Sequence, residues 1–257
     1  MKKFTTLAAK IQFVLLTGFF ILAGATANAQ EIDASKPTNF YTQLINNAEY
    51  VQNKTGGNLI GYRGEILFAP SEKHLILGEL PVLYNDQTQK FGLGDIRARY
   101  FYLPYKDYTK TFGAFGPSVD VFMPTGSFED GLGTSSWTIV PGITAGIMAA
   151  EWIQFFPIVS YQYVTKPQTD SIPDAFKMEG NGMTFQVITP IVFSPELFAQ
   201  VTPIYQMPDF NNDSRDGYVQ EVLLQYALTP SVQLSGFFRG DFNNETYSYR
   251  LGAVVFL

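Results

Sequence analysis

The chain has no cysteine among its 257 residues and only one histidine, His74. The absence of cysteine excludes a disulfide framework, thiol redox chemistry and a lipid anchor on a cysteine. A hydrolase needs a nucleophile, a base and a residue that orients the base. With one histidine available, few arrangements of this kind can be built, and an enzyme is disfavoured.

Long apolar runs are confined to the N-terminus. Three lysines flank the run Ile11–Gly24, and a small-residue cleavage pattern ends at Ala29. This pattern is typical of a secretory signal peptide, so residues 1–29 are predicted to be removed on export. Beyond it no apolar run reaches the roughly 18 residues that a membrane-spanning helix needs.

Basic residues are also scarce. The chain has 17 Lys and Arg against 23 Asp and Glu, and the predicted signal peptide holds three of the lysines and none of the acids. The exported chain therefore carries 14 basic residues against 23 acidic ones, a formal charge of −9. A nucleic-acid-binding protein needs a basic face, so we expect no nucleic-acid partner.

One polar loop has the spacing of a metal site without its key residues. Asp209, Asn211 and Asp213 match the opening of a calcium loop. Ser214 and Gln220, however, stand where that loop needs glycine and glutamate. We therefore expect no metal ion and no cofactor.

Alternating hydrophobicity is what the chain has in abundance. In Glu245–Leu257 every second residue from Tyr247 is aromatic or aliphatic, and Arg250 lies on the opposite face. A period of two held over about 9–11 residues is the length of a transmembrane β-strand. Because an open sheet edge is costly in hydrocarbon, such a strand must pair with the first one and close a barrel.

Similar segments recur along the chain. The predicted strands are Leu59–Phe68, His74–Tyr84, Leu93–Leu103, Phe112–Met123, Trp137–Ala149, Trp152–Val164, Thr184–Phe193, Phe198–Met207, Tyr218–Leu228, Val232–Asp241 and Glu245–Leu257. Short connections alternate with long ones, as short periplasmic turns alternate with longer extracellular loops in outer-membrane barrels. The even strand count of such barrels favours about twelve strands in an all-β, antiparallel transmembrane barrel. On this topology His74 lies at the periplasmic rim, where a membrane lipase or protease would not place it.

The N-terminal part of the exported chain is ambiguous. Residues 30–57 are predicted to form a periplasmic segment, and residues 58–257 the barrel. Within the segment, Asn39–Gln52 is either a first strand or a short helix that plugs the lumen. Two connections also fit poorly, since Tyr105–Thr111 is long for a periplasmic turn and Asn243–Asn244 is short for an outer loop.

Charged and aromatic side chains are predicted to face the lumen. The charges are Arg63, Glu65, Asp95, Arg97, Arg99, Asp120, Glu221, Arg239 and Arg250, and the aromatics are Phe101, Phe122, Phe156, Phe198 and Phe237. Mixed charges in a lumen usually form ion pairs that satisfy one another, which we favour, but they can also select solutes. The aromatics either line a hydrophobic path or fill the barrel.

Four successive predicted strands contain a proline, namely Pro141, Pro157, Pro190 and Pro203. Proline removes a hydrogen bond from the ladder. The favoured interpretation is that these prolines kink strands and curve the barrel. The alternative is that missing ladder bonds open the wall sideways, so that an apolar solute can leave into the bilayer.

Several motifs resemble those of a known family. They are Gly92-Leu-Gly-Asp-Ile-Arg97, Gly116-Pro117, Met123-Pro-Thr-Gly-Ser127, Leu132-Gly-Thr-Ser-Ser-Trp137 and Pro141-Gly142. In this part the chain resembles the outer-membrane transporter-like proteins named after the meta-pathway of phenol degradation. Met123 and Ser135 depart from its usual leucine and glycine, and Leu257 from the Phe that ends many barrels. The resemblance implies a barrel associated with uptake of small, often aromatic or apolar, compounds.

The sequence thus predicts a bacterial outer-membrane barrel for passive transport of small, apolar or aromatic molecules through a narrow lumen. The expected partners are outer-membrane lipid, a small-molecule solute and the barrel-insertion machinery that recognises the C-terminal strand. The main alternative is a structural or surface-binding barrel with a closed lumen. A soluble periplasmic all-β binding protein ranks third.

Overall fold

A computed structural model of the chain describes residues 39–211 and 216–257. The predicted signal peptide and residues 212–213 of the calcium-like loop lie outside them. In chain order the elements are β1 (Gln43–Gln52), β2 (Leu59–Ser71), β3 (His74–Asn85), β4 (Lys90–Leu93), β5 (Ile96–Tyr102), β6 (Tyr105–Lys106), β7 (Phe112–Met123), β8 (Thr138–Ala150), β9 (Ile153–Val164), the short 3₁₀ helix η1 (Asp174–Phe176), β10 (Gly180–Val192), β11 (Leu197–Met207), β12 (Gly217–Thr229), β13 (Val232–Asp241) and β14 (Thr246–Phe256).

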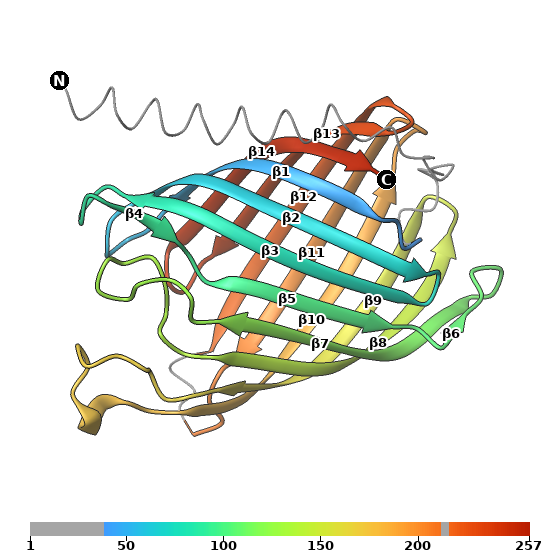
Figure 1. The fold of residues 1–257 in the computed structure, drawn as a ribbon. Helices are drawn as coiled ribbons and strands as arrows, with labels where there is room; N and C mark the ends of the chain where they lie inside the picture. Colours follow the sequence, from blue (N-terminus) through green and yellow to red (C-terminus); the bar gives the residue numbers. More distant parts are fainter. Residues whose placement is uncertain (1–38, 212–215) are drawn as a thin grey trace.

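These strands form one closed antiparallel barrel (Figure 1). Apart from the short strands β4 and β6, each strand pairs with the next one along the chain, and the first and last strands close the barrel. β1 pairs with β14 without interruption, from Gln43 opposite Phe256 to Gln52 opposite Tyr247. Closure leaves no free sheet edge, which is the condition for a β structure in hydrocarbon. The predicted barrel is confirmed.

The wall of the barrel is twelve strands wide. β4 and β5 form one of them, broken at Gly94 and Asp95 because β3 pairs with β4 in one register and with β5 in another. β6 is a short extension that pairs only with β7, Tyr105 opposite Phe115. The connection predicted to be long for a turn therefore contains strand structure of its own.

Strand β1 decides between the strand and the helix that were possible for the N-terminal segment. Residues 43–52 are strand β1, hydrogen-bonded to β14 on one side and to β2 on the other. The alternative of a helix inside the lumen is wrong for these residues, and the barrel begins at Gln43 rather than at residue 58. Alternating Asn47, Glu49 and Val51 are buried while Ala48, Tyr50 and Gln52 are exposed, as a half-exposed strand requires.

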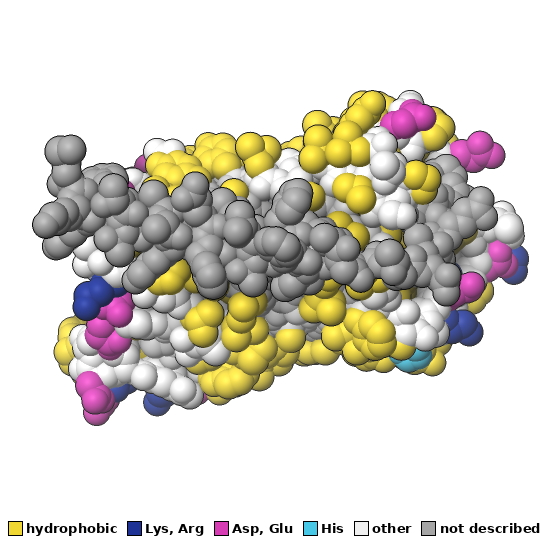
Figure 2. Space-filling view, turned by 45° about the horizontal axis from the view of Figure 1, so that its top comes forward, with side chains coloured by type: hydrophobic (Ala, Val, Ile, Leu, Met, Phe, Trp, Pro, Cys, Tyr) yellow, Lys and Arg dark blue, Asp and Glu magenta, His cyan; other side chains and the backbone are white. Residues whose placement is uncertain are grey.

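The outer surface of the barrel is apolar. Large hydrophobic side chains that point outward include Ile60, Ile66, Phe68, Ile76, Ile143, Val159, Leu224 and Leu251, all more than 40% exposed. In Figure 2 hydrophobic side chains are numerous over the part of the wall that is not drawn in grey, while Lys, Arg, Asp and Glu gather at the two ends. A belt of this kind matches the hydrocarbon layer of a membrane. No helix in the described part of the chain is long and apolar enough to cross a bilayer.

The connections alternate in length. Two residues join β2 to β3, β8 to β9 and β12 to β13, and these turns share one end of the barrel with the C-terminus. The connections from β7 to β8 and from β9 to β10, the second of which contains η1, are long and lie at the other end. The first end is periplasmic and the second extracellular in a barrel of this type.

Candidate functional site in the barrel lumen

The alternation of strand residues brings the predicted lumen charges together inside the barrel. On one side, Glu49 of β1 accepts hydrogen bonds from Arg63 Nε and Nη2 at 3.0 and 3.1 Å, and from Arg250 Nε at 3.1 Å. Ser248 Oγ donates to the same carboxylate at 3.0 Å. The Glu49 side chain is 1% exposed, so its charge is balanced almost entirely by these partners.

This network continues around the wall through two more glutamates. Arg63 Nη1 and Arg97 Nη1 both donate to Glu79, at 3.1 and 2.8 Å. Arg250 Nη1 and Asn47 Nδ2 donate to Glu65 Oε1, at 3.2 and 3.0 Å. In this part of the lumen the charged side chains are paired with one another.

Arg97 links the network to the next strand. Its Nε and Nη2 donate to the Asp120 carboxylate, with the shortest contact, Nη2 to Oδ2, at 2.6 Å. Asp95 has a different role, because it accepts from the backbone N–H groups of Gly126 and Thr134, at 3.0 and 2.8 Å, and from the Thr134 hydroxyl. Asp95 thus ties the base of the loop between β7 and β8.

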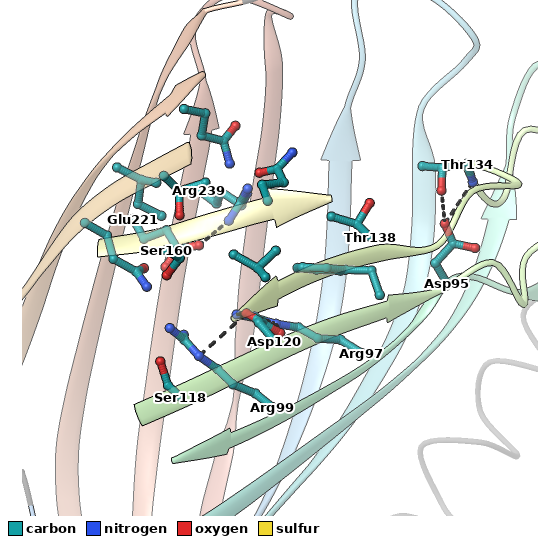
Figure 3. A pocket seen from close by; sticks show the side chains of 17 residues that line it. Asp95, Arg97, Arg99, Ser118, Asp120, Thr134, Thr138, Ser160, Glu221 and Arg239 are labelled. Carbon is teal, nitrogen blue, oxygen red and sulfur yellow. Dashed lines mark hydrogen bonds and ion pairs between the residues drawn. The ribbon is translucent and has the colours of Figure 1, made fainter. Parts of the chain in front are cut away.

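Across the lumen, Arg239 of β13 is paired with Glu221 of β12. Between this pair and the Arg97–Asp120 pair lies a cavity of about 380 Å³ (Figure 3). Its walls come from eight strands, β5 and β7 to β13. The lining residues are Asp95, Arg97, Arg99, Ser118, Asp120, Phe122, Thr134, Thr138, Val140, Ser160, Gln162, Thr184, Gln186, Ile204, Gln206, Glu221 and Arg239.

The five predicted lumen aromatics divide into two groups. Three lie against arginines: Phe122 is 5.1 Å from Arg97, Phe101 is 4.6 Å from Arg99 and Phe237 is 4.5 Å from Arg250, measured from ring centroid to Cζ. Phe156 and Phe198 are buried, 6% and 9% exposed. The first group stabilises the arginines of the charge network through cation–π contacts. Phe156 belongs to an apolar cluster nearer the periplasm.

That apolar cluster packs the periplasmic part of the lumen. Its buried members are Leu103, Ala114 and Phe156, and Phe40, Tyr108, Met148 and Ile188 pack against them. Tyr108 comes from the connection between β6 and β7 and meets Phe156 edge to face, with ring centroids 6.5 Å apart. Phe40, just before β1, lies 6.4 Å from Phe101. Residues on both unusual segments, the start of the chain's described part and the long turn, therefore enter the periplasmic mouth.

The four predicted prolines lie where hydrogen-bond ladders are interrupted. The interruptions fall at Pro141 and Pro157 between β8 and β9, at Pro190 between β9 and β10, and at Pro203 between β10 and β11. On its other side each proline keeps a partner, as Pro190 does in Gln200. Two further prolines, Pro81 and Pro117, lie opposite the breaks that separate β4, β5 and β6. Each ladder therefore stops where the backbone lacks an N–H group.

The outer mouth is crossed by a contact between two long loops. Glu129 accepts hydrogen bonds from the hydroxyls of Thr169 and Ser171, the second at 2.9 Å. The Thr169 hydroxyl, followed by a backbone N–H group and then the Ser171 hydroxyl, holds the pKa of the Glu129 carboxyl below its ordinary value of 4.5. Gln168 N also donates to Ser135 O at 2.7 Å. The loop between β7 and β8 is thereby fastened to the loop between β9 and β10.

Two central residues of the charge network, Glu49 and Glu79, were not among the predicted lumen charges. Glu49 lies in the segment that could have been strand or helix, so its direction was open. Glu79 lies in β3, in a run of mainly apolar residues. Leu75, Leu83 and Glu79 are all buried and separated by even numbers of residues, which is the signal that places Glu79 on the lumen face.

Neither a family model nor a curated protein matches the chain. Solved structures do. An outer membrane channel from Pseudomonas putida F1 has a TM-score of 0.56 at 13% identity, covering 88% of this chain and 100% of the channel. The NanC porin has a TM-score of 0.55 at 11% identity, covering 84% of this chain and 99% of the porin. The chain has the fold of an outer-membrane channel barrel.

The KdgM porin, in complex with disordered oligogalacturonate, is similar to the same degree, with a TM-score of 0.53 at 11% identity over 82% of this chain and 98% of the porin. At these identities the likeness concerns the fold. Together with the closed wall and the apolar belt, it places the chain in the bacterial outer membrane, as the sequence predicts. The family suggested by the sequence motifs stays a resemblance.

Proposed function

We propose that this protein is a passive channel for small, apolar or aromatic molecules that cross the outer membrane through its narrow lumen. The observation that carries the proposal is the order of environments along the barrel. A solute entering from outside meets a cavity with polar and charged walls, and then the cluster around Phe156. A molecule with an apolar surface can lie against that cluster at little cost in free energy. A strongly hydrated molecule must give up hydrogen bonds to water there, which costs much more.

Two other lines support the same proposal. The solved structures with this fold include an outer membrane channel and the NanC porin. The motifs around Gly92–Arg97 and Met123–Ser127 resemble a family associated with uptake of small aromatic or apolar compounds. Insertion of the chain by machinery that recognises the C-terminal strand β14 belongs to this proposal as well.

The apolar cluster also favours the alternative of a barrel that is closed and serves as structure or as a surface for binding. Recording from the purified protein in planar lipid bilayers separates the two. We expect small current steps that an aromatic solute blocks or shifts, and larger steps after Tyr108→Ala or Phe156→Ala, because either change opens the periplasmic cluster. As a matched control, Tyr218→Ala removes an aromatic from the outer surface and should leave the steps unchanged. Membranes that stay silent with the wild-type protein and with both cluster variants would favour the closed barrel.

A further inference from the structure

Arg99 differs from the other arginines that face the lumen in the described part of the chain. Arg63, Arg97, Arg239 and Arg250 each donate hydrogen bonds to a carboxylate. Arg99 donates none to any described residue, and its Nε is buried without a partner. Its side chain is 12% exposed and lines the cavity (Figure 3).

The nearest acid does not satisfy this guanidinium. Asp120 Oδ2 lies 3.6 Å from Arg99 Nε, beyond a good hydrogen bond. The same oxygen already accepts from Arg97 Nη2 at 2.6 Å and from Arg97 Nε at 3.2 Å. The Arg99 guanidinium therefore has no hydrogen-bonded acceptor among the described residues, and an acceptor from a solute that reaches it from the cavity would be stabilised.

The acids of the cavity offer no competing site for a cation. Asp120 is held by Arg97, Glu221 by Arg239, and Asp95 by two backbone N–H groups and a hydroxyl. Three arginines and three acids line the cavity, so the attraction for an anion is local to Arg99 and does not come from an excess of positive charge.

The rest of the lining suits a small molecule with one charged group. The amides of Gln162 and Gln186 make no hydrogen bond to described residues, so they are free to bind oxygen atoms. Val140 and Phe122 supply apolar surface. A cavity of about 380 Å³ is at the small end of ligand pockets, which span roughly 300–1,000 Å³.

We propose that this cavity binds small organic carboxylates with an apolar body, and that Arg99 is the partner of the carboxylate. The planar guanidinium can donate two parallel hydrogen bonds to the two carboxylate oxygens. Phe101, whose ring centroid lies 4.6 Å from the Arg99 Cζ, packs against the guanidinium and stabilises its position. This inference rests on the proposed channel function and adds to it a class of substrate.

The test compares three solutes of similar size in single-channel recordings of the full-length protein: benzoate, benzyl alcohol and benzylammonium. We expect benzoate to block at the lowest concentration. Arg99→Gln should weaken the benzoate block by about tenfold to a hundredfold, the equivalent of one hydrogen-bonded charge, and should leave the weak block by benzyl alcohol unchanged.

Arg239→Gln is the matched control. It removes the same charge from the same cavity, but from an arginine that is already paired with Glu221. Its effect on the benzoate block should therefore be much smaller than that of Arg99→Gln. Asp120→Asn adds a test in the other direction, because it removes the competing acceptor and should strengthen the block. Heat-modifiable migration on gels shows whether each variant is folded.

The results separate this inference from the proposed function. An open channel that benzoate and benzyl alcohol block equally overturns the carboxylate site and leaves the channel standing. The same holds if Arg99→Gln and Arg239→Gln weaken the block equally. Should Arg99→Gln fail to fold, the wild-type comparison of the three solutes still decides. A silent membrane with the wild-type protein overturns both.

Discussion

The barrel has two unlike walls. The strands β8 to β11 contain no Asp, Glu, Lys or Arg, and each contains one of the prolines Pro141, Pro157, Pro190 and Pro203. We call these four strands the neutral wall. The remaining strands, which we call the charged wall, carry every ionised side chain of the lumen network.

The two walls also differ in their backbone pairing. In the charged wall the ladders from β12–β13 round to β2–β3 run without a gap through the lumen residues, and breaks occur only where β3 changes partner from β4 to β5 and where β7 changes partner from β5 to β6. All three ladders within the neutral wall are interrupted. Buried ion pairs need fixed geometry, because a small displacement leaves a charge without its partner. The comparison indicates that one wall is a rigid frame and the other can deform at lower cost.

Breaking the ion pairs of the rigid frame should have the largest effect on the free energy of unfolding. Glu49→Gln keeps the shape of the side chain but leaves Arg63 and Arg250 without a full counter-charge in a buried position. Removing one partner of a buried ion pair costs about 3–5 kcal/mol. We expect a loss of that order in the free energy of unfolding, measured by urea titration of the protein folded into lipid vesicles.

Glu221→Gln provides the control for this change. Glu221 is paired with Arg239 alone among the described residues, and its side chain is 19% exposed against 1% for Glu49. The loss of stability should be clearly smaller. Equal losses in the two variants would mean that the frame is no more tightly coupled than a single ion pair.

Most strands of both walls could be predicted from the sequence, although β1 was left open between strand and helix, but the pairing of the charges could not. A period of two arises because one face of each strand meets lipid and the other the lumen, so it is written into local sequence. Which arginine faces which acid depends on the register between strands, set by loops whose lengths alone do not fix it. Arg97 and Arg99 look equivalent in sequence, yet one is fully paired and the other is not.

Other features of the site could be predicted from the sequence only in part. The lumen direction of Glu79 follows from alternation, and the interrupted ladders follow from the prolines, since a missing N–H is a property of the residue. The packing of Phe40 and Tyr108 in the periplasmic mouth does not follow, because both residues lie outside regular long strands. The sequence indicated only that their segments were irregular.

Restoring the interrupted ladders of the neutral wall should have an intermediate effect on stability. Pro157→Val and Pro203→Val each restore an N–H group at an interrupted position, worth about 1 kcal/mol of stability if the ladder closes. If the wall opens sideways to release apolar solutes, the double variant should also slow their uptake into liposomes. Pro117→Val, in the charged wall, is the matched control and should not slow it.

Uptake and stability of these variants distinguish the two interpretations of the prolines. Slower uptake of an apolar solute with unchanged ion conductance is expected of a lateral exit. A more stable barrel with unchanged uptake is expected if the prolines only curve the strands. In that case the neutral wall is a feature of shape, and the solute leaves through the periplasmic mouth.

The smallest effect concerns the outer mouth, where Glu129 fastens the loop leaving the charged wall to the loop inside the neutral wall. Its pKa is lower with the loops together than with the loops apart, chiefly because of the Thr169 hydroxyl. A carboxylate with a depressed pKa contributes stability above its ordinary value, here 4.5, and the contribution is lost as the pH falls through the lower value. The loops should therefore stay together at neutral pH and separate in acid, below about pH 4.5.

Protease cleavage within residues 165–179, measured on the folded protein at a series of pH values with an acid-active protease, reports this separation. The wild-type protein should become more sensitive as the pH falls below 4.5, after correction for the pH dependence of the protease on an unfolded substrate. Glu129→Gln should be sensitive at every pH and show no such step, because an amide does not ionise. Since Glu129 is exposed, the step should be shallow, and the Glu49-centred frame should keep the barrel folded throughout. A step of equal size in both proteins would assign the acid sensitivity to another group and leave the two walls unconnected at this mouth.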